Sequence, residues 1–159
     1  MKIYTSYFYQ VRFMKPYMIP LSTACFDPKW FHQNQNQDFV WKDKNGVYNG
    51  LRAPVFAPGP MCEGLCYGHD TCTQQNPLSC LFLKTYRYQL DQLDYNDIIK
   101  RCENIANKIK NIEQFNEEPI IILLVHEAYN NPCSERRPIQ EWFASHGKEV
   151  VEWMPEKNI

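Results

Sequence analysis

The chain has 159 residues and a formal net charge of -1, with 17 basic and 18 acidic side chains. This length fits one domain with a single core, and the balanced charge argues against binding nucleic acid through bulk electrostatics, although it is compatible with a local basic patch. Aromatic residues make up 14% of the chain and only 6 residues are glycine, which excludes a disordered or low-complexity protein.

The amino-terminal stretch MKIYTSYFYQVRF has no continuous apolar segment and no small-residue cleavage site, so we expect no signal peptide. The longest apolar run, residues 120–125, is too short to span a bilayer. We therefore expect a cytoplasmic protein without membrane contact. Its 7 cysteines are then expected to be thiols or metal ligands rather than structural disulfides.

The first part of the chain predicts two strands. Residues 3–8 are rich in β-branched and aromatic side chains, and residues 18–25, MIPLSTAC, are short and mostly apolar. Pro20 lies inside the second strand, which favours a late start or an edge position because proline donates no backbone hydrogen bond. The stretch FDPKWF that follows predicts a loop or a short helical turn.

A long excursion without helical period is predicted from His32 to Pro60. It contains two Asn-Gly turn signals and ends in the proline-rich APVFAPGP. The Asn45-Gly46 pair favours a small hairpin. Together with the cysteine-rich stretch after it, this gives a loop insertion at about residues 32–80, and a loop of such length is usually functional or tied down.

Helical periodicity begins after Cys80. One predicted helical face is formed by Phe82, Tyr86, Leu90 and Leu93. Asp94 is a predicted N-cap of the next helix, with Asp97 as an acidic variant of the capping box. The buried stripe of that helix is expected to consist of Ile98, Cys102, Ile105, Ile109 and Ile112, which makes Cys102 a core thiol.

The run EPIIILLVHE predicts a central strand buried on both faces. In the following helix Ser134 is the predicted N-cap, Pro138 falls in the first turn and Gly147 ends the helix. KEVVEW then predicts a final strand. Strand, helix and strand in this order imply a parallel crossover, so we expect one α/β domain over residues 1–159, with three layers and helices on both faces of a mostly parallel sheet.

Polar residues gather where the central strand ends, which is where open α/β sheets bind ligands. His126 and Glu127 occupy this place, and the stretch CSERR opens the next helix. Backbone N–H groups, the helix dipole and guanidinium groups favour an anion such as phosphate or carboxylate. The predicted anion-binding residues here are Ser134, Arg136 and Arg137.

Two residues of this loop are catalytic candidates. Glu127 could act as a general base or nucleophile, or its carboxylate could only orient Arg136 or Arg137. Cys133 lies at a helix start beside arginines, which lowers the pKa of a thiol, although no base is identified beside it. His126 could equally be a structural histidine.

The loop after the second strand is expected to lie near the same sheet edge. Ser22 and Lys29 are its predicted ligand-binding residues, and Thr23 and Cys25 lie between them. The alternative is that Cys25 belongs to the core and that the aromatic residues after Lys29 pack beneath the sheet.

The cysteine-rich stretch CEGLCYGHDTC and the cysteine after it provide four thiols within nineteen residues, which satisfies the ligand count of a tetrahedral zinc site. The predicted ligands are Cys62, Cys66, Cys72 and Cys80, with His69 as an alternative ligand. The spacing differs from paired C-x2-C knuckles, so an iron–sulfur cluster and the absence of a metal stay open as alternatives. A zinc site with four thiolates would be structural and would pin the excursion to the next helix.

Several segments in order resemble the bacterial and phage family called domain of unknown function 488. They are KIYTSYF, IPLSTACFDPKWF, CLFLKTYRYQLDQLD and IIILLVHEAYNNPCSERRPIQEWF with a final VVEW. The resemblance covers nearly the whole chain except residues 32–60. Many relatives have Cys-His-Arg at the helix start where this chain has Cys133-Ser134-Glu135-Arg136. The resemblance implies an α/β fold and a role in nucleotide or nucleic-acid metabolism.

Three functions remain open from the sequence. The first is a small enzyme acting on a phosphorylated or nucleoside-like substrate, with the excursion as a lid. The second is a non-catalytic phage or bacterial accessory module that binds a nucleotide or nucleic acid through arginines, Lys29 and exposed aromatics such as Trp30 and Trp41. The third is redox or iron–sulfur chemistry at the cysteines. The sequence identifies neither the reaction nor the oligomeric state.

Overall fold

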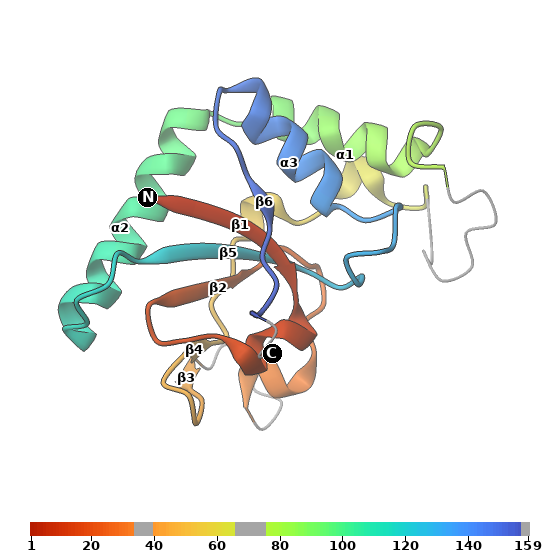
Figure 1. The fold of residues 1–159 in the computed structure, drawn as a ribbon. Helices are drawn as coiled ribbons and strands as arrows, with labels where there is room; N and C mark the ends of the chain where they lie inside the picture. Colours follow the sequence, from red (N-terminus) through yellow and green to blue (C-terminus); the bar gives the residue numbers. More distant parts are fainter. Residues whose placement is uncertain (34–39, 66–75, 157–159) are drawn as a thin grey trace.

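The computed structural model describes residues 1–33, 40–65 and 76–156. These residues form a sheet of four strands in the order β2-β5-β1-β6, and every paired strand is parallel to its neighbour (Figure 1). The strands are β1 (Lys2–Tyr7), β2 (Met18–Ser22), β5 (Ile120–Val125) and β6 (Val151–Glu152). The predicted α/β class with a mostly parallel sheet is thereby confirmed.

β5 is the central strand that its sequence predicted. It pairs with β1 over its whole length on one side and with β2 from Ile120 to Leu124 on the other. Its side chains alternate between the two faces: Ile121 and Leu123 belong to one core cluster, Ile122 and Leu124 to the other, and all four are fully buried. Burial on both faces explains why the strand is a continuous apolar run rather than an alternating one.

β2 lies at an edge of the sheet, as Pro20 indicated. The strand pairs only with β5 among the described strands, and Pro20 lies opposite Ile122. An edge strand needs hydrogen-bond donors on one side only, so the missing N–H of Pro20 leaves the ladder intact.

The three α-helices of the described residues pack on one face of the sheet. They are α1 (Leu81–Asp91), α2 (Tyr95–Glu113) and α3 (Arg136–Ser145), and they bury their apolar faces in a single core cluster. The other face is covered by the 3-10 helices η1 (Phe8–Phe13) and η2 (Lys29–His32) and lies beside the hairpin of β3 (Trp41–Lys42) and β4 (Tyr48–Asn49). The expected three layers with helices on both faces are therefore not confirmed beyond the α/β class.

The predicted N-cap of α2 and the predicted buried face of this helix are confirmed, with one exception. The Asp94 carboxylate accepts a hydrogen bond from the Asp97 N–H at 3.1 Å, as an N-cap should. Ile98 and Cys102 are buried in the core. Ile112, expected in the same stripe, is 60% exposed, because it lies in the last turn beyond the sheet contact. In the described part of the chain no helix combines the length and apolarity needed to cross a membrane.

The long excursion contains the predicted hairpin and is tied to α1. β3 and β4 pair antiparallel around Gly46, whose φ of 80° is the left-handed conformation that the turn requires. Two further 3-10 turns follow, η3 (Pro54–Phe56) and η4 (Pro60–Cys62). The Tyr86 hydroxyl donates to the Phe56 carbonyl at 2.5 Å, and Gln89 bonds both the Ala57 carbonyl (2.8 Å) and the Gly59 N–H (2.7 Å). α1 thus fixes the end of the excursion through side chains on one helical face.

Candidate active site at the carboxyl ends of the strands

A cavity of about 580 Å³ opens where β2 and β5 end. This is the position at which open α/β sheets bind ligands, and the volume is within the usual range for a small molecule. Its walls are residues 23–26 after β2, residues 58–60 and 62–64 of the excursion, Phe82, Val125, His126 and Glu135. The hydrogen bonds of Gln89 to the excursion therefore also hold one wall of the cavity in place.

Two glutamates form a pair beside this cavity. Glu127 follows β5, and Glu135 is the residue that precedes the first turn of α3. The pKa of Glu127 is raised to about 9, first by burial and then by a side-chain hydrogen bond with Glu135 and the negative charge of Glu135, while Arg136 opposes the shift. The pair therefore keeps one proton at neutral pH.

The proton of this pair belongs on Glu127 for a physical reason. Glu135 lies at the amino-terminal end of α3, where the helix dipole favours a negative charge. Glu135 also lines the cavity, whereas Glu127 is half-buried and is not one of the lining residues. The arrangement is an ionised carboxylate that faces the cavity, backed by a protonated carboxyl group.

Two thiols share the cavity wall with Glu135. Burial raises the pKa of both Cys25 and Cys62, and the charge of Glu135 raises both further. Cys25 Sγ donates to the Pro58 carbonyl at 3.3 Å, and Cys62 Sγ lies 3.7 Å from Gln89 Oε1. Both groups are therefore neutral thiols at physiological pH, which disfavours them as nucleophiles.

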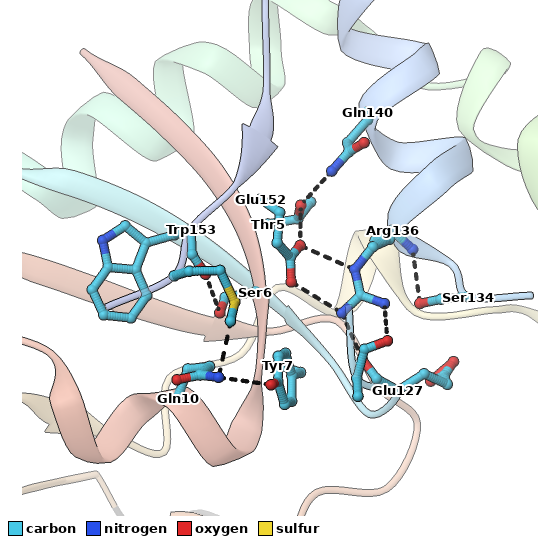
Figure 2. A network of polar contacts seen from close by, with 12 residues as sticks. Thr5, Ser6, Tyr7, Gln10, Glu127, Ser134, Arg136, Gln140, Glu152 and Trp153 are labelled. Atoms are coloured by element: carbon cyan, nitrogen blue, oxygen red, sulfur yellow. Dashed lines mark hydrogen bonds and ion pairs between the residues drawn. The ribbon is translucent and has the colours of Figure 1, made fainter. Parts of the chain in front are cut away.

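Arg136 is the centre of a buried polar network (Figure 2). Its Nε and Nη2 donate to the two carboxylate oxygens of Glu152 at 3.0 and 3.1 Å. Nη1 donates to the Ala128 carbonyl at 2.9 Å, and Nη2 also donates to the Glu127 carbonyl at 2.5 Å. Arg136 thus joins the start of α3 to β6 and to the loop after β5.

The same network extends to β1. Glu152 accepts a hydrogen bond from the Thr5 hydroxyl at 2.8 Å, and Gln140 of α3 donates to the Thr5 oxygen at 2.7 Å (Figure 2). The Arg136 guanidinium lies 5.8 Å from the centre of the Tyr7 ring. Four of the five N–H donors of Arg136 have protein partners, so its geometry is that of a structural residue rather than an anion ligand.

The remaining residues predicted at this helix start do not form an open anion site either. Ser134 is fully buried, and its hydroxyl accepts a hydrogen bond from the Arg136 N–H at 3.3 Å. Arg137 points along α3 to Glu141 at 2.8 Å. Cys133 is 2% exposed and belongs to the interior. The predicted cap at Ser134 is one residue early, since the residue directly before α3 is Glu135.

The loop after β2 is held by an interior carboxylate that the sequence did not single out. Asp27 is 1% exposed at its side chain, accepts a hydrogen bond from Ser22 and pairs with His32 Nε2 at 2.5 Å. Arg52 lies 3.4 Å from the same carboxylate and donates to the carbonyls of Ala24 and Cys25. Ser22 therefore stabilises this loop through its hydrogen bond to Asp27. Lys29 is exposed on η2 and does not line the cavity.

The metal prediction rests largely on residues outside the described part. Cys62 is buried at the cavity wall and Cys80 precedes α1, whereas Cys66, His69 and Cys72 lie outside the described residues. Among the residues that are described, no group of three or more His, Cys, Asp or Glu side chains is placed to hold a metal. Zinc, with an iron–sulfur cluster as the alternative, stays a prediction.

Metal analysis of protein purified without oxygen tests this prediction. We expect about one zinc per chain and a colourless sample, and we expect Cys80→Ser to lower the zinc content while Cys102→Ala, in the helical core, leaves it unchanged. A brown sample with iron would support the cluster instead. Protein without either metal would contradict both.

Sequence reasoning found Glu127 but missed Glu135. The available signal was its position: an acidic residue at the start of the helix that follows the central strand, eight positions after a glutamate at the strand end. Spacing does not reveal that the two carboxyl groups meet, because the loop between them determines the contact.

We compared the chain with protein-family models, curated proteins and solved structures, and no match was found. The resemblance to the domain of unknown function 488 family stays a prediction from the quoted segments.

Proposed function

We propose that the cavity at the ends of β2 and β5 binds a nucleoside or the nucleoside part of a nucleotide, and that Glu135 and Glu127 carry out acid–base catalysis on it. The observation that supports this most is the half-buried carboxyl pair beside the cavity, in which the pKa of Glu127 is raised and Glu135 lines the cavity. A perturbed titratable pair beside a cavity of this size is the usual mark of a catalytic site.

The cavity lining favours an uncharged ligand. Ala24, Pro58, Phe82 and Val125 give it apolar walls, while Thr23, His126 and Glu135 supply a few polar groups. Glu63 and Glu135 bring negative charge, and no lysine or arginine of the described residues lines the cavity. A base and sugar fit this environment, because their N–H and O–H groups can donate to a carboxylate.

A phosphate group would lie outside this cavity. Arg52 places a cation beside the loop after β2, through its hydrogen bonds to the carbonyls of Ala24 and Cys25. Its side chain is 33% exposed, so it is accessible from solvent. Arg52 thereby replaces Arg136 and Arg137 in our proposal as the residue that contacts a phosphate.

The contact between the two carboxyl groups suggests the type of chemistry. Groups that hydrogen-bond to each other are too close for a pair of glycosidase carboxyls, which need separations of roughly 5 Å or more. They match a shared-proton pair, whose carboxylate can take a proton from an attacking water in a hydrolytic reaction. Because only Glu135 of the pair lines the cavity, Glu135 would take the proton from the water and pass it to the leaving group, and Glu127 would stabilise Glu135 by sharing its own proton.

A panel of nucleosides and their 5′-monophosphates tests the proposal, with binding measured by calorimetry and turnover by chromatography of the products. For a ligand that is turned over, Glu135→Gln is expected to keep binding and to lower turnover by about 10²- to 10⁴-fold. Glu141→Gln, an exposed residue of α3, is the matched control and should leave turnover unchanged.

The outcomes separate the parts of the proposal. If no member of the panel binds, the ligand class is wrong. If Glu135→Gln turns over like the wild type, the carboxyl pair is not catalytic. Binding without any turnover by the wild type would favour the non-catalytic accessory module.

A further inference from the structure

We infer that a second cavity, of about 390 Å³, binds a nucleobase together with its phosphate. It lies on the other face of the sheet, between η1, η2 and the hairpin of β3 and β4, and is formed by none of the residues that line the first cavity. Two indole rings and two cations meet at its wall: Trp30, Trp41, Arg12 and Lys44. This site is independent of the proposed acid–base function.

The two tryptophans are held as flat surfaces for stacking. Trp41 Nε1 donates to the Phe31 carbonyl at 3.1 Å, which fixes the orientation of its ring. Trp30 makes T-shaped contacts with Phe31 and Phe8, with ring centres 5.9 and 6.4 Å apart, yet stays 45% exposed. A base can stack on an indole that is held in place by neighbouring groups and stays partly exposed.

The cations beside these rings are positioned by the backbone around them. The Arg12 guanidinium lies 3.9 Å from the centre of the Tyr9 ring, and its Nε donates to the Tyr9 carbonyl at 3.0 Å. Asn45 Nδ2 donates to the Arg12 carbonyl at 2.8 Å, which joins the hairpin to η1. Arg12 and Lys44, from these two segments, therefore both border one cavity and supply charge for a phosphate.

The acidic residue that lines this cavity, Asp43, forms hydrogen bonds within the hairpin. Asp43 Oδ1 accepts hydrogen bonds from the N–H groups of Asn45 (2.9 Å) and Val47 (3.1 Å), and Oδ2 accepts from Asn49 Nδ2 at 3.0 Å. These three donors partly neutralise the charge of Asp43. A ligand in the cavity therefore meets a positive potential from Arg12 and Lys44. Indole faces beside positive charge are complementary to a base with a phosphate.

Such a ligand has two sources, a free mononucleotide or a single-stranded nucleic acid. Calorimetric titrations with thymidine 5′-monophosphate and with a short oligothymidylate distinguish them, and inorganic phosphate shows what the phosphate alone contributes. We expect Trp30→Ala to weaken binding about tenfold, since stacking on one aromatic ring contributes this much. Lys44→Ala should weaken it as well and should reduce the salt dependence by about one ion.

Matched controls separate this site from general effects and from the first cavity. Lys108→Ala changes an exposed lysine of α2 and should leave the affinity unchanged. Trp30→Ala and Lys44→Ala should weaken binding here and leave turnover at the first cavity unchanged, whereas Glu135→Gln should lower only turnover, so failure of the proposed catalysis and failure of this site are distinguishable. Circular dichroism checks the fold of each variant. If Trp30→Ala unfolds, alanine substitutions at the exposed residues Arg12 and Lys44 test the site instead.

The inference is overturned if neither thymidine nucleotide binds, or if they bind and both Trp30→Ala and Lys44→Ala leave the affinity as it is. Binding of inorganic phosphate with equal affinity also overturns it, because the rings would then contribute nothing. Tighter binding of the oligonucleotide than of the mononucleotide supports the site and identifies a nucleic-acid strand as its ligand. Equal affinity for the two supports it with the mononucleotide as the ligand.

Discussion

Arg136→Ala is expected to lower the free energy of unfolding by about 3–5 kcal/mol, the usual cost of removing one partner of a buried ion pair. The side chains of Arg136 and Glu152 are 8% and 17% exposed, so water cannot replace the lost donors fully. The carbonyls of Glu127 and Ala128 lose their donors in the same variant. Urea denaturation followed by circular dichroism measures the change.

Arg137→Ala is the matched control, since the two arginines are neighbours in the first turn of α3. The side chain of Arg137 is 41% exposed and pairs with Glu141 four residues on, a type of contact that contributes about 0.5 kcal/mol or less. Equal effects of the two substitutions would show that the Arg136 network does not stabilise the fold. A loss confined to phosphate binding would restore Arg136 as an anion ligand.

The wild-type protein is expected to lose stability as pH rises above the usual glutamate range. In the unfolded chain Glu127 titrates near 4.5, whereas in the folded protein its pKa is raised to about 9, by burial first and then by Glu135. Between these values the folded state binds one proton more than the unfolded state. Each pH unit in this window then lowers the free energy of unfolding by at most about 1.4 kcal/mol.

Glu127→Gln should flatten this pH dependence and stabilise the protein at neutral and alkaline pH. The amide keeps a hydrogen-bond donor for Glu135 and carries no charge to bury. Denaturation curves recorded at several pH values measure the effect, with Glu141→Gln as the control that should keep the wild-type slope. A variant that retains the wild-type slope would show that another group causes it.

The fold was largely predictable because its signals are local. The apolar run of β5, the proline of edge strand β2 and the Asp94 cap each act within a few residues. The layer arrangement was less predictable, because η1, η2 and the hairpin cover one face without a helical period. No periodic pattern marks a sheet face that is covered by turns.

The position of the candidate site could be predicted from the sequence, but the contacts between its side chains could not. The sheet rule located the cavity at the end of β5, and Glu127 follows this strand beside Glu135 of the cavity wall. The sequence predicted Arg136 as an anion ligand because it does not reveal the partner of this side chain. That partner, Glu152, lies sixteen residues away in a strand of only two residues. Whether a charged side chain binds a ligand or stabilises the fold depends on contacts between separate elements. A single sequence does not show these contacts.

Titration of the glutamate side chains by carbon-13 NMR, in wild type and in Glu127→Gln, tests the central claim most directly. The account predicts one carboxyl signal of a protonated acid at neutral pH, titrating toward about 9 and missing in the variant. If every glutamate of the wild type is already ionised at neutral pH, the pair of Glu127 and Glu135 does not hold a proton. The proposed acid–base site would then be wrong.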